Sequence, residues 1–232
     1  MTIPKVGRSL KSRLRAGRET VDFFCRTPDW DEIIRPELSF GEKTNSKFVS
    51  DINSSEIYLE FGSGASTLIA SQSAVKRVVS VESDFRFMSA VRSRIDSSNG
   101  GPTDFDFLYV DIGTTGPWGA PILKSRVWRR RQLWPAYPVA PWVNLGAGFR
   151  ADLVLVDGRF RVACALAVIT FQQDSSWKLL VDDFAERSEY FPIKDFANLK
   201  EMRGRMAVFE PKKDLDVMEA QSALRYFQTD WR

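Results

Sequence analysis

The chain has 232 residues, 44% of them hydrophobic and 27% charged, and its 33 basic and 30 acidic side chains leave a net charge of +3. This length fits one elaborated domain better than two, and no apolar run approaches the ~20 residues that cross a bilayer. The chain has no histidine, which excludes imidazole bases, histidine-bound metals and Ser-His-Asp triads.

The N-terminal region is basic and poor in apolar periodicity. Residues 1–18 contain no acid and six basic side chains: Lys5, Arg8, Lys11, Arg13, Arg15 and Arg18. They lack the apolar core of a secretory signal, so they form either a solvated arm or a surface for an anionic partner. We expect a basic arm and leading helices over residues 1–50 and the main domain over residues 51–232. The chain's two cysteines are too few for a disulfide framework, which indicates a cytoplasmic location.

The main domain begins with a short strand, a glycine bend and a helix. An apolar run at residues 57–59 precedes Glu60, Gly62 and Gly64, and an apolar pattern of helical spacing follows. This layout places backbone N–H groups against a ligand. A carboxylate at Glu60 would repel a pyrophosphate and attract an ammonium group. Thr67 replaces the third glycine of a dinucleotide fingerprint. The bend therefore predicts a cofactor with an amino-acid moiety, provided that Glu60 faces it.

The sequence Glu-Phe-Gly-Ser-Gly-Ala-Ser-Thr at residues 60–67 resembles the first motif of the class I, Rossmann-like S-adenosylmethionine-dependent methyltransferases. Later strands of the family are expected to end near residues 82, 112, 157 and 182. The resemblance covers roughly residues 50–232. It implies an α/β fold with a doubly wound sheet of strand order 3-2-1-4-5-7-6 and an antiparallel seventh strand. We expect the closing strands at residues 205–209 and 224–228, after a helix over residues 193–202.

The resemblance assigns cofactor contacts to the ends of the first four strands. The methionine end of S-adenosylmethionine would lie at the bend after the first strand, against Glu60, Gly62, Ser63, Gly64, Ser66 and Thr67. Ribose, adenine and the sulfonium would then meet residues after the next strands, in this order: Glu82 and Ser83, Asp111 and Ile112, and Asp157.

The segment between the third and fourth strands, residues 113–148, is rich in proline and tryptophan. A short helix is expected over residues 122–133, and residues 134–142 contain too many prolines for a regular element. The density of aromatic side chains argues against disorder. One interpretation is an acceptor-binding wall that includes Trp118, and the other is a packed insertion that extends the core or forms a dimer contact. The oligomeric state stays open.

Three carboxylates after the fourth and fifth strands are candidates for the chemistry: Asp157, Asp182 and Asp183. Methyl transfer requires alignment, and it requires a base only where the acceptor keeps its proton, a role open to Asp157 and Asp182. The three acids are similar to the divalent-metal site of catechol-type O-methyltransferases, which implies Mg²⁺ or Ca²⁺. That family has Asp-Asn where this chain has Asp182-Asp183. The other possibility is that the pair caps and stabilises the following turn.

Arg159 and Arg161 are expected to reach the same cleft, where they either bind a carboxylate or phosphate of the acceptor or pair with the acids. These expectations combine into a methyltransferase that acts on a small-molecule or glycan-like acceptor, on oxygen. One alternative is an RNA acceptor, held by the basic arm and the Arg/Trp-rich segment. The other is a non-enzymatic binding protein on the same fold.

Overall fold

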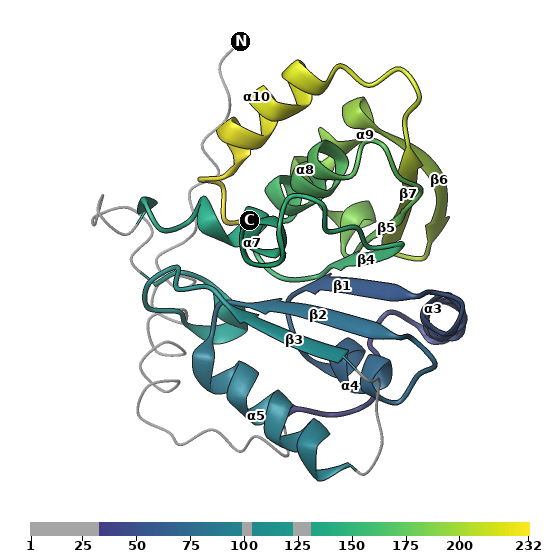
Figure 1. Ribbon diagram of the computed structural model, residues 1–232, viewed down its shortest axis with the longest axis vertical. Coiled ribbons are helices and arrows are strands. Elements are labelled where there is room, and N and C mark those ends of the chain that lie inside the picture. Colours follow the sequence, from purple (N-terminus) through teal and green to yellow (C-terminus); the bar gives the residue numbers. More distant parts are fainter. Residues whose placement is uncertain (1–32, 99–103, 123–130) are drawn as a thin grey trace.

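The computed structural model describes residues 33–98, 104–122 and 131–232 (Figure 1). The basic arm over residues 1–18 and most of the helix expected at residues 122–133 lie outside this range. Within it, no helix is both long and apolar enough to cross a membrane.

Seven strands form one sheet in the order β3-β2-β1-β4-β5-β7-β6. Their bounds are β1 (Ile57–Phe61), β2 (Arg77–Glu82), β3 (Asp104–Tyr109), β4 (Leu153–Val156), β5 (Lys178–Val181), β6 (Ala197–Arg203) and β7 (Met206–Pro211). Strands β1 to β5 pair in parallel, whereas β7 runs antiparallel to both β5 and β6. The predicted fold class and strand order are confirmed.

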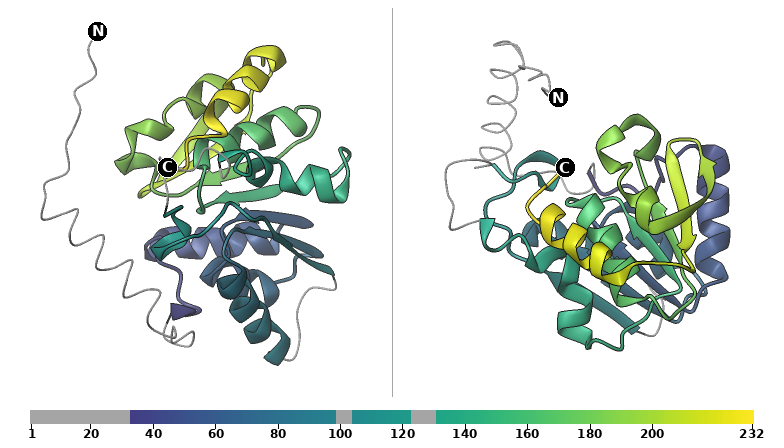
Figure 2. Two further views of the ribbon diagram at one scale, coloured as in Figure 1. Left: turned by 90° about the vertical axis from the view of Figure 1, so that its left-hand side faces the viewer. Right: turned by 90° about the horizontal axis from the view of Figure 1, so that it is seen from above.

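Helices cover both faces of the sheet, which gives three layers (Figures 1 and 2). One face carries α3 (Glu42–Asn53), α4 (Ala65–Ser71) and α5 (Phe85–Ser97). The other carries α7 (Ala136–Leu145), α8 (Arg161–Phe171) and α10 (Val217–Phe227), with the single turn α9 (Ile193–Phe196) beside α8. The short 3₁₀ turns are η1 (Pro117–Gly119), η2 (Phe184–Glu186) and η3 (Ser188–Tyr190).

The two-sided cover explains why the central strands are apolar on both faces. All four residues of β4 are buried. Alternation along β1 sends Leu59 and Phe61 toward the layer of α7 and α8, and Tyr58 toward α3. Glu60 stands on the same face of β1 as Tyr58, because the two are two positions apart in the strand.

Helix α7 corrects the prediction that residues 134–142 form no regular element. Pro138 lies in the first turn of α7, where a backbone N–H would have no partner within the helix, so its lack of an N–H costs no helical hydrogen bond. Only Pro141 removes one. The buried indoles of Trp134 and Trp142 compensate by packing in the core, and each donates to a backbone carbonyl, that of Ile112 at 3.0 Å and that of Phe149 at 3.1 Å. This part of the insertion is therefore the crossover helix between β3 and β4.

One of the two predicted closing strands is found and the other is not. The strand predicted at residues 205–209 is β7, which begins at Met206, but residues 224–228 lie at the end of α10. The helix expected over residues 193–202 ends after one turn and is followed by β6. The sequence was misleading because Phe196 and Leu199 are spaced as on a helix, while β6 exposes four of its seven residues. The tight turn at Gly204, with φ +60°, pairs β6 with β7, and that pairing is set by tertiary contacts.

Candidate cofactor and acceptor site

The glycine bend after β1 is wedged between the ends of β2 and β4. The Gly62 N–H donates to the carbonyl of Val81 at 2.9 Å, and the Gly158 N–H donates to the carbonyl of Phe61 at 2.6 Å. A Cβ on Gly62 would lie 2.7 Å from the Cα of Gly158, and the backbone there has φ +99°. Only glycine fits this close approach without strain. The bend thus occupies the edge where doubly wound sheets bind their ligands.

Glu60 is fully buried, and its carboxylate faces the protein rather than the open edge. Its Oε1 accepts hydrogen bonds from the hydroxyls of Ser80, at 2.7 Å, and Thr67. Its Oε2 accepts from the hydroxyls of Tyr58 at 2.9 Å and Ser66 at 2.7 Å. Burial raises the pKa of the Glu60 carboxyl, and the four hydroxyl donors oppose that shift. The expectation that Glu60 faces an ammonium group is corrected here, because strand alternation turns it toward α4.

The hydroxyls of Ser66 and Thr67 serve the bend itself. Both donate to Glu60, and the Thr67 Oγ1 also accepts from the Gly64 N–H at 2.8 Å. Glu60 therefore ties the glycine bend to the first turn of α4 and to β2. Both hydroxyls are thus engaged within the protein, whereas the resemblance to the family had placed Ser66 and Thr67 against the methionine end of the cofactor.

Glu82 ends β2 directly beside the bend and is 6% exposed. Its Oε1 accepts from the backbone N–H groups of Ser83 at 2.6 Å and Asp84 at 2.9 Å, and its Oε2 accepts from the N–H of Ser63 at 3.0 Å. Burial raises the pKa of Glu82 while these backbone donors lower it. A carboxylate oxygen has two lone pairs, so Oε2 keeps one acceptor site beyond its bond to Ser63.

The two residues expected beside adenine differ in exposure. Asp111 is exposed, with its Oδ1 accepting the Gly113 N–H at 2.7 Å, whereas Ile112 is buried in the core. An open hollow of about 270 Å³ lies nearby, between the ends of β2 and β3. Its lining consists of Ser83, Asp84, Phe85, Arg86, Tyr109, Gly113, Thr114 and Thr115.

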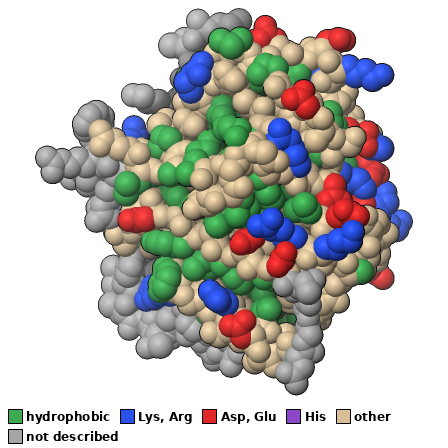
Figure 3. Space-filling model, viewed as in Figure 1, with side chains coloured by type: hydrophobic (Ala, Val, Ile, Leu, Met, Phe, Trp, Pro, Cys, Tyr) green, Lys and Arg blue, Asp and Glu red, His purple; other side chains and the backbone are tan. Residues whose placement is uncertain are grey.

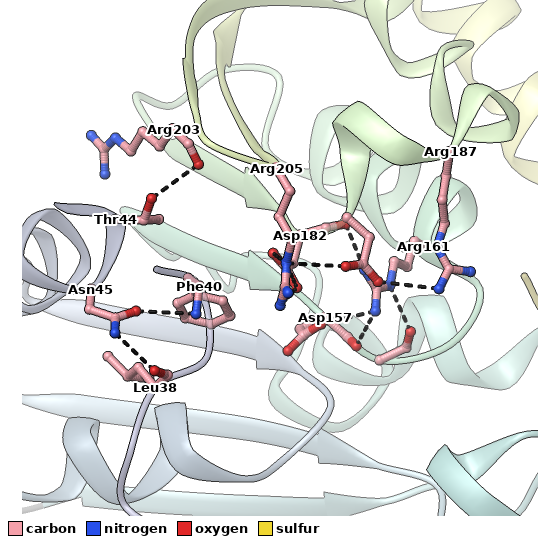
Figure 4. A network of polar contacts seen from close by, with 12 residues as sticks. Leu38, Phe40, Thr44, Asn45, Asp157, Arg161, Asp182, Arg187, Arg203 and Arg205 are labelled. Atoms are coloured by element: carbon pink, nitrogen blue, oxygen red, sulfur yellow. Dashed lines mark hydrogen bonds and ion pairs between the residues drawn. The ribbon is translucent and has the colours of Figure 1, made fainter. Parts of the chain in front are cut away.

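The carboxylates that follow β5 form ion pairs with arginines (Figure 4). Asp182 is 1% exposed and is held in two-pronged fashion by Arg205, with Nε at 2.9 Å from Oδ1 and Nη2 at 2.7 Å from Oδ2. Asp183 lies 3.2 Å from Arg161, 3.3 Å from Arg187 and 3.2 Å from Arg205. The acids gather as the sequence predicted, but they gather around guanidinium groups.

Asp157, after β4, joins the same cluster through Arg161. Its Oδ1 lies 2.9 Å from the Arg161 Nη2, and 35% of its side chain remains exposed. Burial raises the pKa of Asp157 to about 7, against the lowering effect of Arg161, and water at the exposed part of the side chain moderates that shift.

The cluster does not fit a divalent cation. Mg²⁺ or Ca²⁺ would need the carboxylate oxygens that Arg161, Arg187 and Arg205 already neutralise. No group of three or more acidic, cysteine or histidine side chains in the described part of the chain is arranged to hold a metal. The proposed metal ligands Asp157, Asp182 and Asp183 are therefore corrected to partners in an ion-pair network.

Arg161 and Arg159 play different parts, although both were expected at the acceptor. Arg161 is buried and donates hydrogen bonds to the carbonyls of Gly158, Asp157 and Asp182. It therefore pairs with the acids, which was the second of the two roles expected for it. Arg159 is half-buried, and its Nε donates to the carbonyl of Trp118 at 2.7 Å. The indole of Trp118 is 88% exposed.

Sequence reasoning missed the hydroxyl partners of Glu60 and the arginine on the β6–β7 turn. A signal existed for Ser80, which is the one polar residue among the valines in the middle of β2 and pairs in register with Glu60. Tyr58 could have been inferred from its place two residues before Glu60. For Arg205 there was no signal, since its contact with Asp182 depends on how the turn folds.

Solved structures provide the comparison, because no family model and no curated protein matches the chain. A methyltransferase-like protein from Silicibacter pomeroyi is 32% identical, with a TM-score of 0.74 over 84% of this chain and 98% of its own. Weaker likenesses include an N-methyltransferase from Bradyrhizobium japonicum complexed with S-adenosyl-L-homocysteine (11% identity, 76% and 90% coverage, TM-score 0.43). Another is a dimethyladenosine transferase from Plasmodium falciparum (16%, 75% and 62%, TM-score 0.39).

The two weaker likenesses carry no argument about function. The Silicibacter pomeroyi protein has the identity and coverage that establish a family. The chain therefore belongs to that methyltransferase-like family, within the class I, Rossmann-like methyltransferase superfamily.

Proposed function

We propose that the protein uses S-adenosylmethionine to methylate a hydroxyl oxygen of a small-molecule or glycan-like acceptor. The observation that carries this proposal is the glycine bend at Gly62, enclosed by the ends of β2 and β4 in a member of this family. Glu82 follows one of the neighbouring strands, and an acid at such a strand end suits the ribose hydroxyls of a nucleoside cofactor.

The residues at the bend fit such a cofactor at two points. The free acceptor site on the Glu82 Oε2 suits a ribose hydroxyl. The hollow beside β2 and β3 has a volume of about 270 Å³, slightly smaller than the ~300–1,000 Å³ of pockets that hold a whole ligand. It therefore suits one part of the cofactor, such as its adenine base. Glu60 acts indirectly in this proposal, because it fixes the bend and does not touch the ligand.

Asp157 is the better of the two predicted bases. When bound, the cofactor supplies an activated methyl group, and an acceptor hydroxyl must lose its proton as it takes the methyl. A carboxyl group with a pKa of about 7 is suited to accept that proton near neutral pH. Asp182 is buried against Arg205, so its role is to hold the loop after β5.

Calorimetric titration with S-adenosylhomocysteine tests the donor. We expect binding to the wild type and at least a tenfold loss for Glu82→Ala, as one hydrogen bond to a charged group is worth about 1.5–3 kcal/mol. Glu210→Ala is the matched control, since Glu210 lies on β7 in a surface pair with Lys200. No binding to the wild type at millimolar ligand would remove the proposal.

The acceptor atom needs a separate experiment. Incubation with S-adenosylmethionine and paired acceptors that differ only in one group, such as 4-hydroxybenzoate and 4-aminobenzoate, is followed by mass spectrometry. Methylation of the hydroxyl compound alone supports oxygen as the target, and methylation of the amine alone contradicts it. On the face shown in Figure 3, Lys and Arg side chains lie among Asp and Glu side chains, which favours a small acceptor over a polyanion.

A further inference from the structure

Arg159 differs from the other arginines at this edge of the sheet because it has no acidic partner within the described residues. Arg161 and Arg187 are each paired with Asp183, whereas the guanidinium of Arg159 makes one hydrogen bond to the described residues, from Nε to the Trp118 carbonyl. Its two terminal nitrogens have no hydrogen-bond partner among those residues. Burial first, and then the nearby Arg161 and Arg187, lower the pKa of Arg159.

The turn that Arg159 holds lies across the end of β1. A Cβ on Gly119 would lie 3.4 Å from the Ser83 hydroxyl, after β2, and 3.9 Å from the Arg159 Cγ, after β4. The turn is also anchored at its start, where the Thr115 hydroxyl donates to the Asp84 carboxylate at 3.1 Å. It is thus fixed to both neighbours of the strand that leads into the glycine bend.

Trp118 projects from this turn in an unusual conformation. Its backbone has φ 62° and ψ 28°, the left-handed region that bulky residues rarely adopt, and its indole is 88% exposed. Residues held in such strained backbone conformations cluster at active sites and ligand clamps. The exposed ring therefore belongs to the residue whose backbone carbonyl holds the Arg159 guanidinium, a planar fork of donors.

We propose that the acceptor is anionic and planar: Arg159 binds its carboxylate or phosphate group, and Trp118 packs against its ring. This rests on the proposed function, and it specifies the substrate class of the same site. A bound oxyanion would provide the acidic partner that Arg159 lacks among the described residues.

The test compares ligands that differ in charge but hardly in shape. Ligand-observed NMR measures the affinity of benzoate, phenyl phosphate and the neutral benzamide for the full chain at low salt. The variants are Arg159→Gln, Arg159→Lys, Trp118→Ala and a control, Arg150→Gln. Arg150 lies just before β4, at the opposite edge of the sheet, and bonds only neighbouring carbonyls. Thermal unfolding shows that each variant is folded.

We expect the wild type and Arg150→Gln to bind at least one of the two anions about tenfold more tightly than benzamide, as a charge-assisted hydrogen bond provides. Arg159→Gln should abolish this preference, and Arg159→Lys should retain part of it. Trp118→Ala should weaken anion and amide alike. Which anion binds better separates a carboxylate acceptor from a phosphate one. A wild type without charge preference, or Arg159→Gln with an unchanged preference, overturns the proposal.

Titration with S-adenosylhomocysteine keeps this inference separable from the proposed function. Unchanged affinity in Arg159→Gln is expected, and a large loss would overturn the inference by assigning Arg159 to the donor. Anion preference in a chain that does not bind S-adenosylhomocysteine would support the anion site while the methyltransferase proposal failed.

Discussion

Replacing Gly62 by alanine tests whether the glycine bend is built as described. The new Cβ would lie 2.7 Å from both the Cα and the N of Gly158, and these backbone atoms cannot turn aside as a flexible side chain would. The residue would also have to keep a φ of +99°. Two costs therefore add, one from backbone strain and one from overpacking.

The structure offers variants that separate these costs. Gly64→Ala meets nothing within 4 Å but keeps a φ of +155°, so it carries strain alone. Gly148→Ala also meets nothing within 4 Å and has no positive φ, so it carries neither cost. We expect losses in the free energy of unfolding of about 1–3 kcal/mol for Gly64→Ala and about 2–5 kcal/mol for Gly62→Ala. Gly148→Ala should stay within about 0.5 kcal/mol of the wild type or stabilise slightly.

Urea unfolding, followed by fluorescence and circular dichroism, measures all three variants, with coincident transitions as the check on two-state behaviour. Losses of this size are a substantial share of the ~5–15 kcal/mol of a typical domain. The essential result is the order of the losses in unfolding free energy, largest for Gly62→Ala, smaller for Gly64→Ala and smallest for Gly148→Ala. Equal stability of the Gly62 and Gly64 variants would show that the Gly158 backbone does not stand against the bend.

Two further predictions concern the carboxylate–arginine cluster. The pKa of Asp157 is about 7 in the folded chain and about 3.9 when unfolded, so the folded chain holds the extra proton between these values and its stability falls as pH rises through that window. Asp157→Asn should flatten this fall in urea titrations between about pH 4 and 7, and an unchanged slope would exclude Asp157 as its source. Arg205→Gln leaves the buried Asp182 without its two-pronged partner and should cost about 3 kcal/mol, whereas Lys200→Gln, in the exposed pair with Glu210, should cost under about 1 kcal/mol. Similar losses in thermal or urea unfolding for these two variants would contradict the burial argument.

Several features of this chain could be predicted from local sequence because their causes are local. The apolar run that ends at Glu60, the two glycines after it and the helical pattern beyond them identify strand, bend and helix. The strand ends at Glu82 and Asp157 follow in the same way, since buried parallel strands are short apolar runs with polar residues at their ends. The order of strands came from the resemblance to the family, and the sheet has that order.

Tertiary structure decided what each side chain faces. Glu60 follows an apolar run and precedes a glycine, which indicates a ligand contact, but its direction depends on which face of β1 meets α4 and on Ser80 standing opposite in the neighbouring strand. The metal assignment failed for the same reason. Nothing near Asp182 in the sequence shows that Arg205, on the turn between β6 and β7, reaches it.

The insertion between β3 and β4 contains a helix that local sequence did not predict. Its prolines disfavour a helix by local propensity, but the burial of Trp134 and Trp142 against the sheet outweighs the loss of one hydrogen bond. Short-range pattern therefore determined the strand, bend and helix around Glu60 and the strand ends at Glu82 and Asp157, whereas it mistook α7, β6 and α10. Only the packing of distant segments decided which charges are neutralised by one another within the described part of the chain, as Arg205 neutralises Asp182.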